Sequence, residues 1–254
     1  MTRLSRWVAP VLGITVFFGL WEGLLRLFRV KAFILPRPSH VIDNLIGNAP
    51  FFAREGLVTG REALAGLAIS LVIALALAIP MVRWSAVDRA IQPVATLIQV
   101  VPIVCYAPAF VIWLHPGNRP IVAVVALIVL VPLLFSLVTG LRSVDPHAVE
   151  LLRSVGASRR ELLRFLQIPS ALPSLLAGLR ISVGLALVGA VLGEWFALRS
   201  HGLGVQIQKA MSIQGGSTLM WSSAFALGLI GGLALVALAG AERLLPGRRR
   251  TSQN

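Results

Sequence analysis

The feature of this sequence that most restricts its fold is a succession of long stretches without Asp, Glu, Lys or Arg. A helix needs roughly 20 apolar residues to cross a membrane, and most of these stretches approach or exceed that length. We predict about six spanning helices on this criterion. Their approximate limits are residues 7–28, 63–82, 91–114, 120–141, 169–193 and 217–241. Glu22 and Arg26 end the first span as a helical ion pair in the favourable order.

The composition agrees with a chain whose surface faces lipid. Charged residues make up 13% of the 254 positions and hydrophobic residues 57%, with a mean hydropathy of +0.85. A soluble domain carries about a quarter of its residues charged. The predicted fold class is therefore all-α, a polytopic membrane helical bundle formed by residues 1–254 as a single domain.

The formal charge of +13 raises the question of a nucleic-acid partner. The basic residues are scattered between apolar stretches rather than gathered on one polar face, so anionic lipid headgroups are the favoured partner and nucleic acid is excluded. With the N-terminus inside the cell, 13 basic residues lie on the inner side and 8 on the outer side. Because positive charge favours the cytoplasmic side, we predict a multi-pass bacterial inner-membrane protein with both termini in the cytoplasm.

Three prolines interrupt the third predicted span: Pro93, Pro102 and Pro108. Proline kinks a helix, and irregular backbone inside a membrane persists only beside protein or a water-filled cavity. The span either borders a translocation path or has a kink stabilised by packing alone. Glu194, after the fifth span, is either an outer-interface residue or part of the path. The candidate path residues are Pro102, Tyr106, Pro108 and Glu194.

The longest predicted cytoplasmic segment, residues 143–168, has the signals of two short helices. Asp145 and Pro146 are a favourable helix start, and the first helix should run to about Val155. Gly156 can adopt a positive φ and end it. Ser158 and Glu161 have the spacing of a capping box, which predicts a second helix.

We expect Pro169 and Pro173 to end that second helix and lead into the next span. The result is a tight helix–turn–helix elbow. Its apolar residues are too many for so short an element to bury, so they require the chain's own inner helix ends or a partner. These residues are Val149, Leu152, Val155, Leu162, Phe165 and Leu166.

The same segment resembles the EAA loop of ABC importer permeases, whose pattern is E-A-A, three residues, G, nine residues, I-x-L-P. The matching pieces are Glu150-Leu151-Leu152, Gly156-Ala157-Ser158 and Leu166-Gln167-Ile168-Pro169. The chain departs from the pattern only by apolar exchanges, at Leu151, Leu152, Leu166 and Ile168. The resemblance implies a MetI-like permease fold and a coupling helix that docks in a groove of an ATP-hydrolysing subunit. It assigns coupling to Glu150, Leu151, Leu152, Gly156, Ala157 and Ser158.

Other pieces extend the resemblance over most of the chain. They are Trp21-Glu22, residues 35–39, residues 141–146 and Gly193-Glu194, which look like permeases for nitrate, sulfonates, taurine and related solutes. This implies a small solute of that kind or a vitamin precursor. It also implies three partners: a dimer of ABC ATPase subunits that binds ATP and Mg, an extracytoplasmic solute-binding protein, and a second copy of the permease.

The sequence lacks the residues for ATP chemistry of its own. A phosphate-binding loop needs Gly-Lys-Ser/Thr, but Val30 and Gln208 precede the two lysines, Lys31 and Lys209. We therefore predict no catalytic, cofactor-binding or metal-binding residue, and expect Cys105 to be a small buried apolar residue. An ion-coupled secondary transporter and a passive channel remain as alternatives. An ion-coupled secondary transporter usually carries ionisable groups near the bilayer midplane.

Overall fold

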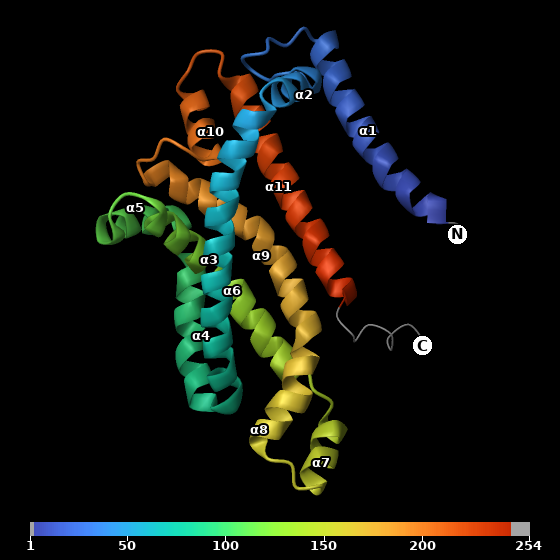
Figure 1. Ribbon diagram of the computed structural model, residues 1–254, viewed down its shortest axis with the longest axis vertical. Coiled ribbons are helices and arrows are strands. Elements are labelled where there is room, and N and C mark those ends of the chain that lie inside the picture. Colours follow the sequence, from blue (N-terminus) through green and yellow to red (C-terminus); the bar gives the residue numbers. More distant parts are fainter. Residues whose placement is uncertain (1–2, 245–254) are drawn as a thin grey trace. The chain divides into compact units, whose positions relative to one another are not determined.

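The computed structural model describes residues 3–244, and every regular element in that range is a helix (Figure 1). This confirms the predicted all-α fold class. The first helices are α1 (Arg3–Leu27), α2 (Pro38–Gly47), α3 (Ala49–Arg83), α4 (Ser85–Val100), α5 (Ile103–Leu114) and α6 (Asn118–Arg142). They are followed by α7 (Pro146–Ser154), α8 (Arg159–Leu162), the π-helical turn η1 (Leu163–Gln167), α9 (Ile168–Phe196), α10 (Leu203–Met211) and α11 (Ser217–Leu244).

Several of these helices can cross a membrane. Within the described residues, four are long and apolar enough: Ala49–Arg83, Asn118–Arg142, Arg159–Phe196 and Ser217–Arg243. The bent pair α4 and α5 makes a fifth if it is one span. The first predicted span, residues 7–28, falls mostly on α1, and its membrane crossing stays a prediction.

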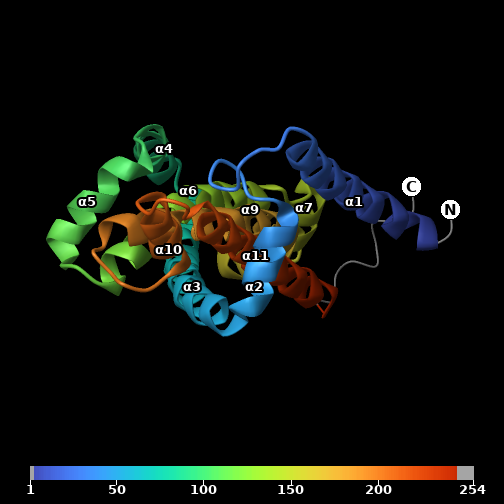
Figure 2. The same ribbon diagram turned by 90° about the horizontal axis from the view of Figure 1, so that it is seen from above.

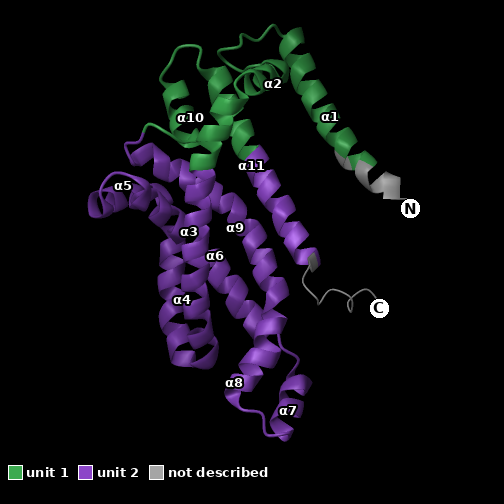
Figure 3. Ribbon diagram, viewed as in Figure 1, with its two compact units in different colours: residues 1–58, 200–228 green, residues 59–199, 229–254 purple. Residues whose placement is uncertain are grey.

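The chain divides into two compact units (Figure 3). The first comprises residues 1–58 and 200–228, and the second comprises residues 59–199 and 229–254. Each is described separately below. The assignment of residues 1–254 to a single domain stays a prediction.

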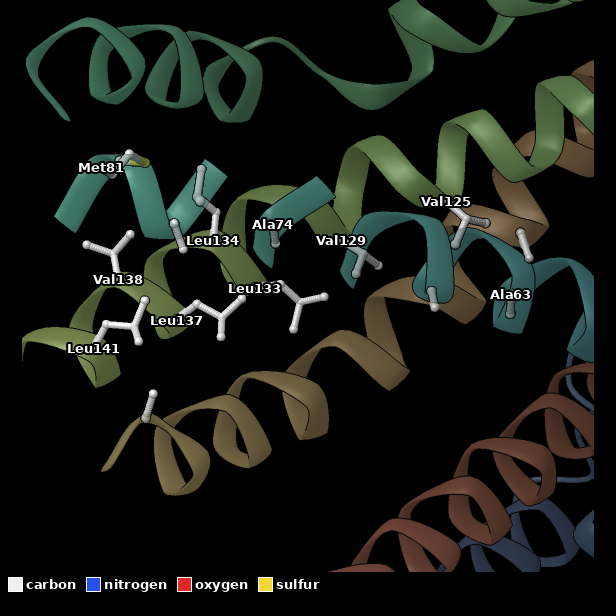
Figure 4. Close-up of a cluster of buried hydrophobic side chains, with 14 of the residues drawn as sticks. Ala63, Ala74, Met81, Val125, Val129, Leu133, Leu134, Leu137, Val138 and Leu141 are labelled. Atoms are coloured by element: carbon white, nitrogen blue, oxygen red, sulfur yellow. The ribbon is translucent and has the colours of Figure 1, made fainter. Parts of the chain in front are cut away.

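Helix α6 is at the centre of the second unit. It is apolar around its circumference, which is typical of a helix surrounded by others, and it buries Val125, Val129 and Leu133 completely. Side chains of α3 face it, among them Ala74 and Met81 (Figure 4). Small residues on α3 let the two helices lie close together. This packing forms part of a buried apolar cluster to which α9 also contributes.

Helix α9 also lies along α6 and touches it through glycines. A Cβ atom on Gly178 would lie 2.6 Å from Ser136 Cβ, and one on Gly193 would lie 2.9 Å from Ile121 Cα. Both distances are too short, so only glycine fits. A Cβ atom on Gly189, one turn before Gly193, would lie 2.9 Å from Ile128 Cγ2, so both glycines pack against α6. A Cβ atom on Gly228 or Gly232 of α11 would meet nothing within 4 Å among the described residues.

The third predicted span is interrupted at one of its three prolines, Pro102. Helices α4 and α5 meet at 99° across Val101 and Pro102 and curve along one side of α6 (Figure 2). Val101 is extended, with φ −74° and ψ 124°, because a following proline disfavours the helical conformation. Cys105 was expected to be buried but is exposed, because α5 buries only Ala107.

Helix α3 starts earlier than predicted. Its span was expected to begin at residue 63, but the helix begins at Ala49 and runs for 35 residues. The charged residues at positions 54–62 hid its beginning. Two of them, Glu55 and Glu62, are buried and have partners within the fold. A separate short helix, α2, precedes α3.

In the first unit, Glu22 joins α1 to α2. Its carboxylate pairs with Arg26 at 2.8 Å, as predicted, and accepts hydrogen bonds from the Ser39 backbone N–H and hydroxyl. Trp21 also lies edge-on to Trp221, with ring centroids 5.3 Å apart. These contacts hold the N-terminal helix against the first half of α11 within this unit.

The glycine contacts predict unequal responses to one added methyl group on α9. Gly193→Ala should lower the unfolding temperature of the purified protein, because overpacking a tight contact costs about 1–3 kcal/mol. Gly184→Ala is the control, since its Cβ meets nothing within 4 Å. It should leave stability unchanged or raise it by up to about 1 kcal/mol through helix propensity. Equal unfolding temperatures for the two variants would contradict the packing described for α6 and α9.

Candidate functional site

The elbow, residues 143–168, projects beyond the ends of α6 and α9 in the second unit (Figure 1). Asp145 caps its first helix, because its carboxylate accepts the His147 backbone N–H at 2.9 Å, and Pro146 occupies the first turn. The helix ends at Ser154, one residue before the predicted limit. The start and end of α7 were thus readable from the sequence.

A Schellman motif terminates α7. The Ala157 N–H donates to the Leu152 carbonyl at 3.0 Å, and the Gly156 N–H donates to the Arg153 carbonyl at 3.0 Å. Gly156 has φ +81°, the left-handed conformation predicted for it. A side chain with a Cβ is strained in that conformation, so glycine sets the direction in which the chain leaves α7.

The predicted capping box opens the second helix. Ser158 Oγ accepts the Glu161 N–H at 3.3 Å, and Glu161 Oε2 accepts the Ser158 N–H at 2.7 Å. Only Ala157 separates this box from the Schellman glycine. The angle between the two short helices is therefore determined by adjacent local hydrogen bonds.

The expectation that Pro169 and Pro173 end the second helix is wrong. Helices α8 and α9 continue through the π turn Leu163–Gln167 as one helix from Arg159 to Phe196. The Ile168 N–H donates to the Leu163 carbonyl, five residues back. Proline clashes with the carbonyl four residues before it in a regular helix. The wider turn before Pro169 lets the helix pass into the span without a break.

The elbow leaves part of its apolar surface uncovered. Leu162 is buried by the chain itself, whereas Leu151 is 68% exposed and Val155 is 74% exposed. Of the six predicted apolar residues of the elbow, the chain itself therefore buries Leu162 and leaves Val155 exposed, and a partner for Val155 stays a prediction. Of the predicted coupling residues, Leu152 and Ala157 are half-buried, and Glu150, Leu151, Gly156 and Ser158 are exposed. All six lie on α7 or the turn that follows it.

The role of the predicted path residues stays a prediction. Tyr106 and Pro108 lie on α5 and Pro102 immediately precedes it; both prolines are exposed and Tyr106 is half-buried. An apolar cavity of about 560 Å³ lies between α3, α5 and α6, but none of these three residues lines it. Its α5 wall comes from Phe110 and Leu114 instead.

Glu194 is 1% exposed and belongs to a buried polar cluster that sequence reasoning missed. Thr59 donates its hydroxyl to Glu194 at 2.6 Å, and Arg199 pairs with Glu62 beside it. Glu194 is therefore buried within the second unit, and its place at the outer interface or in a path stays a prediction. Thr59 and Glu62 are three residues apart and so share one face of α3, which is the signal that could have revealed the cluster.

A similar interaction lies in the first unit, where Glu55 is fully buried. It accepts the Gly202 backbone N–H at 2.7 Å and the Gln206 amide at 3.2 Å, and it contacts His201. This carboxylate holds the start of α10 against the first turns of α3. Sequence reasoning had placed this part of the chain in an outer loop.

The capping box generates a prediction. Ser158→Ala should speed amide hydrogen exchange at residues 159–162, because losing a cap costs about 0.5–2 kcal/mol. Ser154→Ala is the control, since the Ser154 hydroxyl bonds only to the Leu151 carbonyl within α7. Exchange at residues 159–162 that is as slow in Ser158→Ala as in the control would contradict the role of the box.

Comparisons with known proteins agree with this geometry. Residues 66–250 match the family described as binding-protein-dependent transport system inner membrane component. The chain is 32% identical to the formylaminopyrimidine transport permease protein ThiX of Halalkalibacterium halodurans, over 98% of this chain and 100% of that protein. It is 36% identical to the riboflavin transport system permease protein RibX of Chloroflexus aurantiacus, over 95% and 92% respectively.

The crystal structure of an amino acid ABC transporter with histidines has a similar fold. Its TM-score is 0.63 at 17% sequence identity, and the match covers 80% of this chain and 97% of that one. The resemblance of residues 150–169 to the EAA loop, the family match and the shared fold agree. This chain belongs to the binding-protein-dependent family of inner membrane components, the permease subunits of ABC importers of small solutes, and has their MetI-like fold.

Proposed function

We propose that the elbow couples this permease to a separate ATPase subunit. The observation that supports this most directly is the exposure of Leu151 and Val155 on a helix whose two ends are fixed by local hydrogen bonds. A rigid short helix with an uncovered apolar face suits insertion into a groove of a partner. The coupling residues are Glu150, Leu151, Leu152, Gly156, Ala157 and Ser158.

The assembly contains two copies of the permease and two ATPase subunits, which hold the ATP and Mg. An extracytoplasmic binding protein delivers the solute. Both termini and the elbow lie on the cytoplasmic side, as the distribution of basic residues favours. When ATP closes the ATPase dimer, the two elbows move with it, and the permease passes from its inward-open to its outward-open state.

The solute belongs to the class of heteroaromatic vitamins and their precursors. Two relatives that match nearly the whole chain are named for formylaminopyrimidine and riboflavin transport. A taurine transport permease of Escherichia coli, TauC, matches less of it, at 29% identity over 82% of this chain. Taurine-like and other sulfonate solutes are the second choice.

Gly156 provides a test of coupling. Gly156→Val should reduce ATP-driven uptake at least about tenfold, because a β-branched residue at positive φ costs on the order of 1–3 kcal/mol and misdirects the turn. Gly156→Asn should keep most of the uptake, because Asn enters the left-handed region readily. Uptake of labelled formylaminopyrimidine, riboflavin and taurine is measured in proteoliposomes that contain the complete complex.

Association with the ATPase subunits is measured in the same preparations by size-exclusion chromatography. Wild-type uptake by Gly156→Val, with a normal amount of bound ATPase, would overturn the assignment of coupling to the elbow. Loss of uptake in both variants would instead show that the turn tolerates no side chain.

An ion-coupled transporter is the alternative with structural support, since Glu62 and Glu194 are buried on helices of the second unit. The two proposals differ in their energy source. If ATP is maintained inside the vesicles while an ionophore collapses the ion gradients, we expect uptake to continue. Immediate arrest would favour ion coupling. Equilibration without accumulation under both conditions would indicate a passive channel.

A further inference from the structure

A second cavity, of about 330 Å³, lies in the second unit beside the elbow. The last turns of α3 form one wall, and α7, α8 and the π turn form the other. Four of its lining residues are arginines: Arg83, Arg153, Arg159 and Arg160. None of them is among the coupling residues, and the proposed function does not use them.

These arginines have no counterion within the described residues. The cavity has no Asp or Glu in its lining, and the described ion pairs of this unit use other arginines. The nearby carboxylates have other partners: Asp88 pairs with Arg142 at 2.8 Å, and Glu161 accepts the Ser158 N–H. Glu150 lines a neighbouring cavity together with Arg153. Even if Glu150 balances the charge of Arg153, the positive charges of the other three arginines remain unbalanced.

Guanidinium groups that line one cavity without a carboxylate partner repel each other and favour an anion between them, although one of them, that of Arg83, also lies over the Trp84 ring at 5.1 Å. A guanidinium presents a planar fork of N–H donors that matches phosphate oxygens in bidentate geometry. The rest of the lining is mostly apolar, with Ile79, Val82 and Leu162 among others, on the same helices as the arginines. The amide of Gln167, on the π turn, adds a neutral donor.

We propose that this arginine cavity binds a phosphate group, either of an anionic phospholipid or of free inorganic phosphate. The cavity lies where α3 ends at Arg83, which is headgroup level for a helix that spans the bilayer. Basic pockets between helices at this level suit acidic headgroups, and the apolar part of the lining suits the glycerol and the first acyl carbons. The phosphate then joins the end of α3 to the elbow.

Native mass spectrometry of the full-length chain in detergent tests this without requiring transport or ATP. After removal of bound lipid, phosphatidylglycerol should bind at least about tenfold more tightly than phosphatidylcholine. The double variant Arg83→Gln with Arg160→Gln should lose this preference. Arg89→Gln is the matched control, because Arg89 is an exposed arginine on α4 that does not line the cavity.

Two further arms complete the experiment. If millimolar inorganic phosphate displaces phosphatidylglycerol and itself raises the unfolding temperature of the wild type only, free phosphate is the occupant. If inorganic phosphate has neither effect, the lipid is the occupant. Arg160→Lys should bind phosphatidylglycerol with an affinity between those of the wild type and the double variant. Because Arg160 is exposed, this single substitution remains informative if the double variant does not fold. Equal binding of the two lipids by the wild type, or an unchanged preference in Arg160→Gln, would overturn the proposal.

Discussion

Helices α6 and α9 approach each other closely because the glycines of α9 that face α6 have no Cβ atom. In a bilayer, lipid tails are as apolar as the side chains of a helix, so the hydrophobic effect gives little drive for two helices to associate. Close van der Waals packing therefore has to hold this pair together. The buried cluster around Val125, Val129 and Leu133 rests on that contact, and both ends of the elbow continue directly from these two helices.

Much of the helical framework could be predicted from stretches of apolar residues, and the failures have a common physical cause. The start of α3 was missed because its charged residues are buried by partners far away in sequence, as Glu62 is by Arg199. Two prolines also had opposite outcomes. The chain breaks at Pro102 after an extended residue, whereas at Pro169 a π turn absorbs the proline and the helix continues. A local pattern does not show which of these a proline will cause.

The elbow was predictable almost residue by residue because its structure depends on hydrogen bonds between neighbours in sequence. Asp145, Gly156 and Ser158 each act within a few positions of themselves. The arginine cavity could not be found in this way, because Arg83 joins it from a helix that ends 70 positions before Arg153. The burial of Glu194 likewise depends on Thr59, which is 135 positions away. Sites assembled from distant segments require the fold.

The unbroken helix from Arg159 to Phe196 has a mechanical consequence. A helix of 38 residues rises about 57 Å in total, and if it moves as one rigid body it is a lever that reaches from the elbow to the buried carboxylate of Glu194. A rotation of about 5° at one end of such a lever displaces the other end by roughly 5 Å. A movement of the elbow is in that case transmitted to the opposite end of the helix, where Thr59 and Glu194 meet.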